Sequence, residues 1–465
     1  MDYKTRIKIA RILLEDKIPV NSEITVLGWI RTVRESSNVA FLNINDGSCM
    51  DSLQAVVTNP AEYPVLKKLL TGAAVRVKGT LVASQGKGQK YELTVTSLDM
   101  VGEADSTYPL QAKRHTFEFL REIAHLRPRT NTFGAVNRIR SKLSYAIHQY
   151  YQERGFYYIH TPIISASDAE GAGDMFRVTT LDMQNVPKKD GDIDWNEDFF
   201  GTEAYLAVSG QLEGELLATA LGDIYTFGPT FRAENSNTSR HASEFWMIEP
   251  EMAWAELEDN MDLAEDFLRS LFSFALEKCS DEMAFFNKWV DKEVIQTLEG
   301  VINSKFERIS YTEAVKILKA AKQKFEFPVD WGTDLQSEHE RYLTEKTFKR
   351  PVIVYDYPEK IKAFYMRLND DGRTVRAMDV LVPKVGEIIG GSQREERFDV
   401  LTDRIKHLGI GDLENYSWYL DIRKYGTVPH AGFGLGFDRA IMYITGMANI
   451  RDVIAFPRVP RWAKF

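Results

Sequence analysis

The stretch FGPTFRAENSNTSRHASEFWMIEPEMAW, residues 227–254, decides the fold class of this chain. Two apolar, strand-like segments flank a polar loop, so the sequence predicts a β-hairpin. Four side chains of the hairpin can converge on one concavity: Arg232, Glu234, Arg240 and His241. Phe245 opens the return strand and offers a flat stacking surface. Because the planar guanidinium of arginine matches phosphate oxygens, the hairpin is a candidate phosphate site, although many charged hairpins only face solvent.

Two segments outside the hairpin strengthen this interpretation. GFGLGFDRA, residues 432–440, combines glycines that permit close packing with an arginine, Arg439, that opens a helix. GFYYIHTPII, residues 155–164, follows a predicted amphipathic helix over 134–154 and reads as a strand that Pro162 ends. Most of the predicted strands between these segments are joined by short turns. The sequence therefore favours an antiparallel sheet flanked by helices.

Together the three segments resemble the signature motifs of class II aminoacyl-tRNA synthetases, in the order in which that family carries them. Residues 155–164 resemble the first motif, 227–254 the second and 432–440 the third. The resemblance implies an α+β protein whose class II catalytic domain, 134–465, is an antiparallel sheet with flanking helices. It also implies a homodimer formed through the first motif, ATP as a substrate and Mg²⁺ as the metal ion.

The N-terminal part of the chain differs in character from the rest. Residues 24–101 contain five β-branched strands, with a short helix expected over 61–70 between the third and the fourth. That order is typical of the OB-fold, a small barrel that often binds single-stranded nucleic acid, although other small barrels bind none. We expect an OB-fold anticodon-binding domain over 1–104 and a basic hinge over 105–133. Residues 111–142 carry eight Lys and Arg against two Glu, which suits either a solvated linker or contact with a phosphate backbone.

A barrel ahead of the catalytic domain resembles the subgroup that charges aspartate, asparagine and lysine, and the resemblance is strongest to the asparagine enzymes. It rests on SASDAEGAGDMF (165–176), VSGQLEGE (208–215) and GEIIGGSQREER (386–397). The aspartate enzymes carry a lysine two residues after the Gln-Leu pair, where this chain has Gly214 followed by Glu215. The resemblance thus implies L-asparagine and tRNA(Asn) as substrates. The alternatives are an aspartate-charging enzyme, including one that tolerates both tRNAs, and an RNA-binding or amide-forming relative that has lost tRNA charging.

The resemblance also assigns roles to individual residues of this chain. Arg232, on the α-phosphate, and Arg439, over adenine and the γ-phosphate, are the expected catalytic residues. The expected ATP-binding set is Arg232, Glu234, Arg240, His241, Phe245, Glu387, Gly436 and Arg439. The expected asparagine-binding set is Glu170, Gln211, Glu215, Glu249 and Arg394. In that set Arg394 receives the side-chain carbonyl, and Glu215 accepts from the amide nitrogen and repels aspartate. Asp379 and Glu387 are the expected Mg²⁺ ligands, and Arg34, Phe41 and Gln54 are expected to read the anticodon.

The composition excludes several other classes of protein. A net charge of −9 leaves nucleic-acid binding to local basic patches. The two cysteines, Cys49 and Cys279, form no CxxC pair, which argues against a disulfide framework or a thiolate zinc site. No run of ~18 apolar residues occurs, so we expect a cytoplasmic protein that contacts no membrane. HERYL, residues 339–343, lacks the second histidine of a zinc-protease helix.

Overall fold

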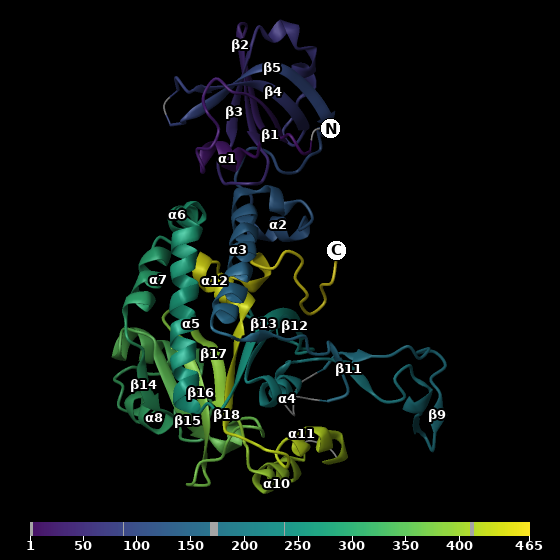
Figure 1. Cartoon of the computed structure of the whole chain (residues 1–465), viewed down its shortest axis with the longest axis vertical. Helices are drawn as coiled ribbons and strands as arrows, with labels where there is room; N and C mark the ends of the chain where they lie inside the picture. Colours follow the sequence, from purple (N-terminus) through teal and green to yellow (C-terminus); the bar gives the residue numbers. More distant parts are fainter. Residues whose placement is uncertain (1–2, 87, 168–174, 237, 410–412) are drawn as a thin grey trace. The chain divides into compact units, whose positions relative to one another are not determined.

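The structure is a computed structural model, and it describes residues 3–86, 88–167, 175–236, 238–409 and 413–465. The chain divides into two compact units: Met1–Asn137 with Phe465, and Arg138–Lys464. No helix within the described ranges is long and apolar enough to cross a membrane. Figure 1 shows the elements of each unit.

The first unit contains a closed five-stranded barrel in the order β1-β2-β3-β5-β4. Its strands are β1 (Glu23–Glu35), β2 (Val39–Asn45), β3 (Leu53–Thr58), β4 (Ala74–Ala83) and β5 (Tyr91–Gly102). This order confirms the predicted OB-fold. The helix expected over 61–70 is instead two short 3₁₀ helices, η1 (Pro60–Glu62) and η2 (Pro64–Lys68). Each begins at a proline, and a proline in a helix interior lacks the N–H of a continuous α-helix and clashes with the preceding turn.

Three short helices complete the first unit. They are α1 (Ile9–Leu13), α2 (Phe117–Glu122) and the 3₁₀ helix η3 (Arg127–Arg129). Ile9 and Ile12 of α1 are buried in the core of the barrel, together with alternate residues of the strands. The predicted hinge, 105–133, falls within this unit.

The second unit is built on an eight-stranded sheet in the order β14-β15-β16-β17-β18-β13-β12-β6. Its strands are β6 (Tyr157–Tyr158), β12 (Asp223–Phe231), β13 (Glu244–Ala253), β14 (Glu307–Ser310), β15 (Val352–Pro358), β16 (Thr374–Val382), β17 (Gly386–Gln393) and β18 (His430–Gly436). All neighbouring strands are antiparallel except the two end pairs, β14 with β15 and β12 with β6. The predicted antiparallel sheet is therefore confirmed, and β12 and β13 form the predicted hairpin over 227–254.

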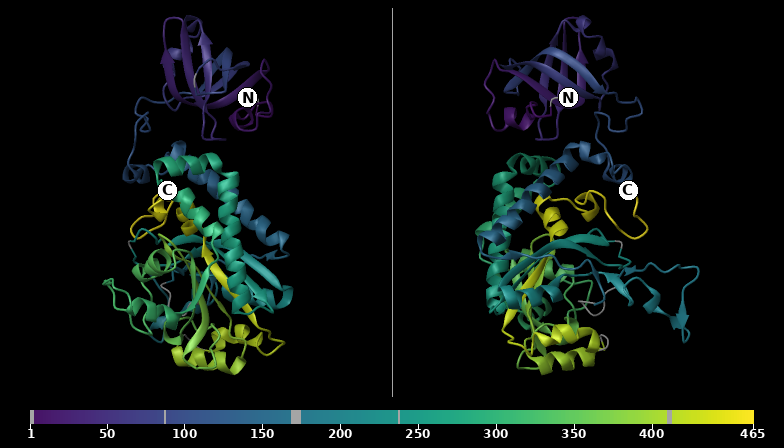
Figure 2. Two further views of the ribbon diagram at one scale, coloured as in Figure 1. Left: turned by 90° about the vertical axis from the view of Figure 1, so that its left-hand side faces the viewer. Right: turned by 45° about the vertical axis from the view of Figure 1, so that its right-hand side comes forward.

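Helices pack against the sheet. They are α3 (Asn131–Glu153), α4 (Gln211–Leu221), α5 (Leu257–Lys278), α6 (Ser280–Trp289), α7 (Val294–Asn303), α8 (Tyr311–Lys319), α9 (Ser337–Arg341), a π-helix (Tyr342–Thr347), α10 (Phe398–Leu408), α11 (Ser417–Asp421) and α12 (Phe437–Thr445). A small sheet, β7 (Ile164–Ser165), β11 (Ala204–Leu206) and β8 (Arg177–Val178), and a hairpin, β9 (Lys188–Lys189) with β10 (Asp192–Ile193), form an arm beside the main sheet (Figure 2).

The long helix α5 determines which face of the sheet is available for a site. Phe267 of α5 lies 6.3 Å from Phe433 of β18, measured between ring centroids. Because successive residues of a strand point to opposite faces, Gly432 and Gly434 point away from α5. A Cβ at Gly432 would meet the side chain of Glu251 on β13, and a Cβ at Gly434 would meet that of Met247 on the same strand. The side chains of β13 that could bind a ligand therefore lie on the face opposite α5.

Candidate active site

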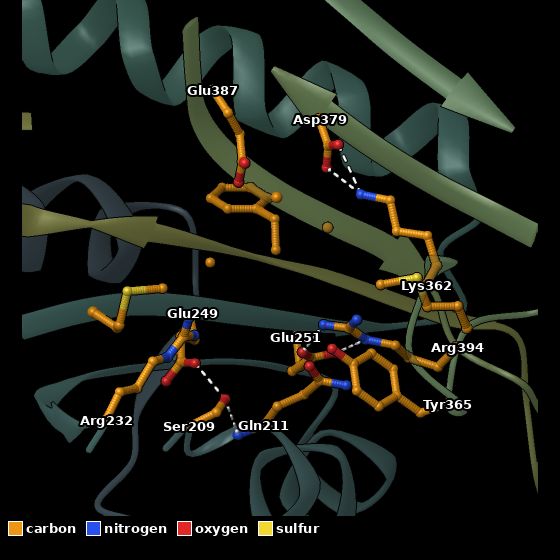
Figure 3. Close-up of a pocket in the computed structure, with 16 residues that line it drawn as sticks. Ser209, Gln211, Arg232, Glu249, Glu251, Lys362, Tyr365, Asp379, Glu387 and Arg394 are labelled. Carbon is orange, nitrogen blue, oxygen red and sulfur yellow. Dashed lines mark hydrogen bonds and ion pairs between the residues drawn. The ribbon is translucent and has the colours of Figure 1, made fainter. Parts of the chain in front are cut away.

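A pocket lies on this face of the sheet, and Figure 3 shows its side chains. It is lined by Ser209, Gln211, Arg232, Met247, Glu249, Glu251, Lys362, Tyr365, Met366, Asp379, Glu387, Gly390, Gly391, Arg394, Phe433 and Gly434. The lining comes from β13, β16, β17 and β18, from the start of α4, from the end of β12 and from the segment between β15 and β16. Strands distant in the sequence thus bring acidic and basic groups into one concavity, as expected of a site that binds a charged substrate.

The hairpin and the first turn of α12 bring basic side chains together, and one of them, Arg232, lines the pocket. Arg232 follows β12, and its guanidinium lies 5.4 Å from the ring centroid of Phe245. Arg439, in the first turn of α12, donates to the carbonyl of Glu387 over 3.3 Å. Burial and the charge of Arg439 lower the pKa of both Arg240 and His241. Arg240 and Arg439 therefore lie close enough for their positive charges to oppose each other, and a nearby anion would offset that repulsion.

Two other residues of the expected ATP-binding set are placed by the same elements. Glu234 lies close enough to His241 for its charge to oppose the lowering of that pKa. Gly436 is the N-cap of α12, three residues before Arg439. The predicted convergence of hairpin and third segment is therefore present in the geometry, whereas the contact of each side chain with ATP stays a prediction.

Glu249 of β13 is fixed by three donors. Its carboxylate accepts from Ser209 Oγ at 2.5 Å, from Thr226 Oγ1 at 3.0 Å and from the Gly210 N–H at 3.1 Å. Gln211 begins α4 directly after these residues, and both Gln211 and Glu249 line the pocket. The sequence expectation that these two residues face one ligand is therefore compatible with the structure.

A buried ion pair forms the floor of the pocket. Arg394 donates through Nε to Glu251 Oε2 at 3.1 Å, through its terminal nitrogens to Glu251 Oε1 and, at 2.7 Å, to Ser392 Oγ. Burial raises the pKa of Glu251 to about 7, against the opposing charge of Arg394. Gly432 has no side chain because the Glu251 carboxylate occupies the space in which its Cβ would lie. Arg394 is thus held in place at the pocket by Glu251 and Ser392, and its contact with a ligand stays a prediction.

The expectation for Glu215 is wrong in this structure. Glu215 is fully buried, is absent from the pocket lining, and accepts from Gln211 Nε2, Tyr419 Oη and Arg423 Nη2. Burial disfavours its charge, but the charge of Arg423 and a hydrogen bond from His430 hold its pKa well below the usual range. With its oxygens occupied by protein donors, Glu215 cannot accept from a substrate amide. The carboxylate that contacts Arg394 is Glu251 instead.

Acidic side chains gather at the other end of the pocket. A Cβ at Gly390 would lie 3.1 Å from Glu387 Oε1 and 3.6 Å from Asp379 Oδ1, so both carboxylates point into the same space. Asp379 also accepts from Lys362 Nζ at 2.7 and 3.0 Å. Burial and the charge of Asp379 raise the pKa of Glu387, and burial and the charge of Glu387 raise that of Glu340 to about 8. An excess of hard oxygen donors of this kind suits a divalent cation.

Several residues at or beside the pocket were not predicted from the sequence. Glu251 could have been predicted to line the pocket. It lies two residues after Glu249 on β13, so the two side chains point to the same face of the sheet. Lys362 has no local signal. Glu340, within the discounted HERYL segment, accepts from the backbone N–H of Glu387 at 3.2 Å. Glu170, expected in the asparagine-binding set, lies outside the residues that the structure describes.

The barrel carries the expected anticodon residues on its outer face. In β2, Ala40, Leu42 and Ile44 are buried, so Phe41 points away from the core and is half-buried. Phe41 pairs with Arg34 of β1, and Asn43 pairs with Gln54 of β3. Because directly paired residues share a face, Arg34, Phe41 and Gln54 form one outer surface. The alternative that Phe41 belongs to the barrel core is thereby excluded.

Comparison with known proteins agrees with this arrangement. A family model described as tRNA synthetases class II (D, K and N) matches residues 117–460, and a model of an OB-fold nucleic acid binding domain matches residues 24–101. The chain belongs to the class II tRNA synthetases of the aspartate, lysine and asparagine group. The expected family and the two-part fold are therefore confirmed.

Similar class II synthetases span essentially the whole chain. The asparagine–tRNA ligase of Geobacter sulfurreducens is 60% identical, with 99% of each protein covered. The asparagine–tRNA ligase of Nostoc sp. is 59% identical and covers 98% of this chain and 99% of its own length. The asparaginyl-tRNA synthetase of Pyrococcus horikoshii, complexed with asparaginyl-adenylate, has a TM-score of 0.85 at 33% identity, covering 98% of each chain.

Proposed function

We propose that this chain is an asparagine–tRNA ligase, which activates L-asparagine with ATP and transfers it to tRNA(Asn). The observation that carries the proposal is its identity of 59–60%, over nearly the full length, to asparagine–tRNA ligases. Two structures with high similarity, from Pyrococcus horikoshii and Entamoeba histolytica, hold asparaginyl-adenylate. The pocket with its buried Arg394 is the place where we assign that adenylate.

The first step forms a bond between the α-carboxylate of asparagine and the α-phosphorus of ATP, and it breaks the bond to pyrophosphate. A carboxylate is already a nucleophile, so the protein needs no strong base and acts by positioning and charge stabilisation. We assign Arg232 to the α-phosphate, Arg439 to adenine and the γ-phosphate, and Phe245 to stacking on adenine. In the second step a terminal ribose hydroxyl of tRNA attacks the acyl carbon and AMP leaves.

The amino acid is placed between α4 and the floor of the pocket. We assign Gln211 and Glu249 to the ammonium group and Arg394 to the side-chain carbonyl. A Cβ at Gly214 would lie 3.7 Å from Glu251 Cγ, so a lysine there would bring its charge to the Glu251–Arg394 pair. Because this chain has a glycine at position 214, that positive charge is absent from the site. The site therefore offers hydrogen bonds to a carboxamide without an extra cation for a second carboxylate.

An amino-acid panel in ATP–pyrophosphate exchange tests the substrate. We expect asparagine to support exchange and aspartate to be poorer by ~10⁴, the scale at which a polar site rejects a mismatched analogue. Equal rates with aspartate in the wild type would contradict the assignment of asparagine.

The Arg232→Ala variant should lower the rate of asparagine-dependent exchange by ~10²–10³, as expected for losing one transition-state contact.

The outer face of the barrel is assigned to the anticodon. Phe41→Ala should reduce tRNA charging by the equivalent of ~1–3 kcal/mol, the value of one stacked base, and leave pyrophosphate exchange unchanged. Phe41→Tyr keeps the ring and serves as the matched control, which should charge tRNA normally. If exchange fell together with charging in Phe41→Ala, Phe41 would have a structural role and the anticodon assignment would fail.

We also assign Mg²⁺ to Asp379 and Glu387. Their carboxylates converge above Gly390, and a magnesium ion there would supply positive charge to the phosphates of ATP. Among the described residues no three His, Cys, Asp or Glu side chains are arranged to hold a metal by themselves, and we assign the remaining coordination positions to phosphate oxygens and water. Mn²⁺ bound to the enzyme with ATP, measured by electron paramagnetic resonance, should fall in Asp379→Asn and persist in Glu345→Gln. Equal binding in both variants would refute these ligands.

The proposal includes a homodimer in the cytoplasm. Tyr157, at the β6 edge of the main sheet, is 57% exposed. Helix α3 lies beside this edge, since its His148 ring contacts Tyr158. Tyr145 of α3 is 67% exposed. Exposed aromatic side chains beside a sheet edge suit a protein interface. Cys49 and Cys279 are both buried and form no disulfide, which suits the reducing cytoplasm. Sedimentation equilibrium should give twice the chain mass of 53.2 kDa, and a monomer at micromolar concentration would contradict the dimer.

A further inference from the structure

A cluster of buried polar side chains lies directly behind the amino-acid pocket, and no substrate role accounts for it. Glu215 of α4 is at its centre, with Tyr419 of α11, Arg423 just after that helix, and His430 at the start of β18. All four are at most 4% exposed. Such a cluster is costly unless every group is paired, so its protonation states can be derived from its hydrogen bonds.

The carboxylate of Glu215 is fully occupied by donors. Its Oε2 accepts from Arg423 Nη2 at 2.7 Å and from Tyr419 Oη at 2.8 Å, and it lies 2.9 Å from His430 Nε2. Its Oε1 accepts from Gln211 Nε2 at 3.0 Å. Arg423 Nη2 also donates to Tyr419 Oη at 2.9 Å, which directs the hydroxyl proton of Tyr419 toward Glu215. Glu215 is therefore ionised and can only accept.

The ring of His430 must then carry two protons. Its Nδ1 lies 2.9 Å from the carbonyl oxygen of Val428, which can only accept, so Nδ1 donates. Its Nε2 lies 2.9 Å from the ionised Glu215, so Nε2 also donates. A neutral ring would place a lone pair against one of these oxygens. The other charges that act on the cluster are Arg394 of the β17 end and Glu251 of β13, which pair with each other.

We propose that His430 is a buried imidazolium and a positioning residue: with Arg423 it holds Glu215 as a carboxylate, and Glu215 turns the side-chain oxygen of Gln211 toward the pocket. The side chain of Gln211 ends in an acceptor group, the carbonyl oxygen, and a donor group, the NH₂ with its two hydrogens. Glu215 engages the donor, so the acceptor remains for the ligand. This orientation suits an ammonium group, and to that extent the inference rests on the proposed function.

The opposite orientation of Gln211 shows why the cluster matters. If Glu215 were neutral, its protonated oxygen could donate to Gln211, and the amide NH₂ would then face the ligand. A donor facing an ammonium group repels it. The charge on Glu215 therefore determines the polarity of the pocket, although Glu215 itself does not line it.

Nitrogen NMR of the full-length enzyme, labelled with ¹⁵N-histidine, tests the protonation state directly. The chain has eight histidines, and His430→Gln identifies the signal by its disappearance. At neutral pH both ring nitrogens of His430 should show the shifts of an imidazolium. In Glu215→Gln the ring should become neutral with its proton on Nδ1, because the amide introduced at position 215 can donate to Nε2. A neutral His430 in the wild type would overturn the proposal, whatever the fate of the variants.

Steady-state kinetics test the consequence for Gln211. Glu215→Gln should raise the KM for asparagine about tenfold, the scale of one hydrogen bond to a charged group, and leave the KM for ATP unchanged. Thr219→Ala, on the same helix but outside the cluster and the pocket lining, is the matched control and should leave both values unchanged. An unchanged asparagine KM in Glu215→Gln would refute the positioning role. Failure of the wild type to use asparagine would instead refute the proposed function and leave the NMR result intact.

Discussion

The structure of the catalytic unit depends on one constraint: a carboxylate and a guanidinium must be buried together at the centre of an eight-stranded sheet. The pair formed by Glu251 and Arg394 links β13 to the end of β17, across β18. Separating either charge from its partner would leave an uncompensated ion in a low-dielectric interior, which costs several kcal/mol. The glycine at 432 follows from this requirement, since any side chain there would displace the carboxylate.

The sequence predicted the parts of this architecture that depend on local pattern. Alternating β-branched residues defined the barrel, and the apolar segments on either side of a polar loop predicted the hairpin over 227–254, which the structure contains. It could not predict contacts made by tertiary packing. Lys362 reaches Asp379 from a loop that carries no motif, and the helices between 280 and 347 bring Glu340 to the same place through long-range packing alone.

The misassignment of Glu215 has a specific physical cause. Gln211 and Glu215 are four residues apart on one helix and therefore share a face, which made both reasonable ligands from sequence. The first turn of α4 reaches the pocket, whereas one turn further along the same face is covered by Tyr419 and Arg423. Spacing identifies which side of a helix is polar, but it cannot show how far along that side the protein interior begins.

The closed hydrogen-bond network around Glu215 also limits how such a site can evolve. Each member of the network forms a hydrogen bond with at least one other member. Replacing a single residue therefore leaves a buried charge or donor without its partner, and several substitutions are needed together to restore the network. Gly214 is different, because it belongs to no part of the network and its Cβ would meet neighbours only at 3.5 Å and beyond. A substitution at position 214 can therefore change the charge beside the Glu251–Arg394 pair while the buried network around Glu215 keeps its hydrogen bonds.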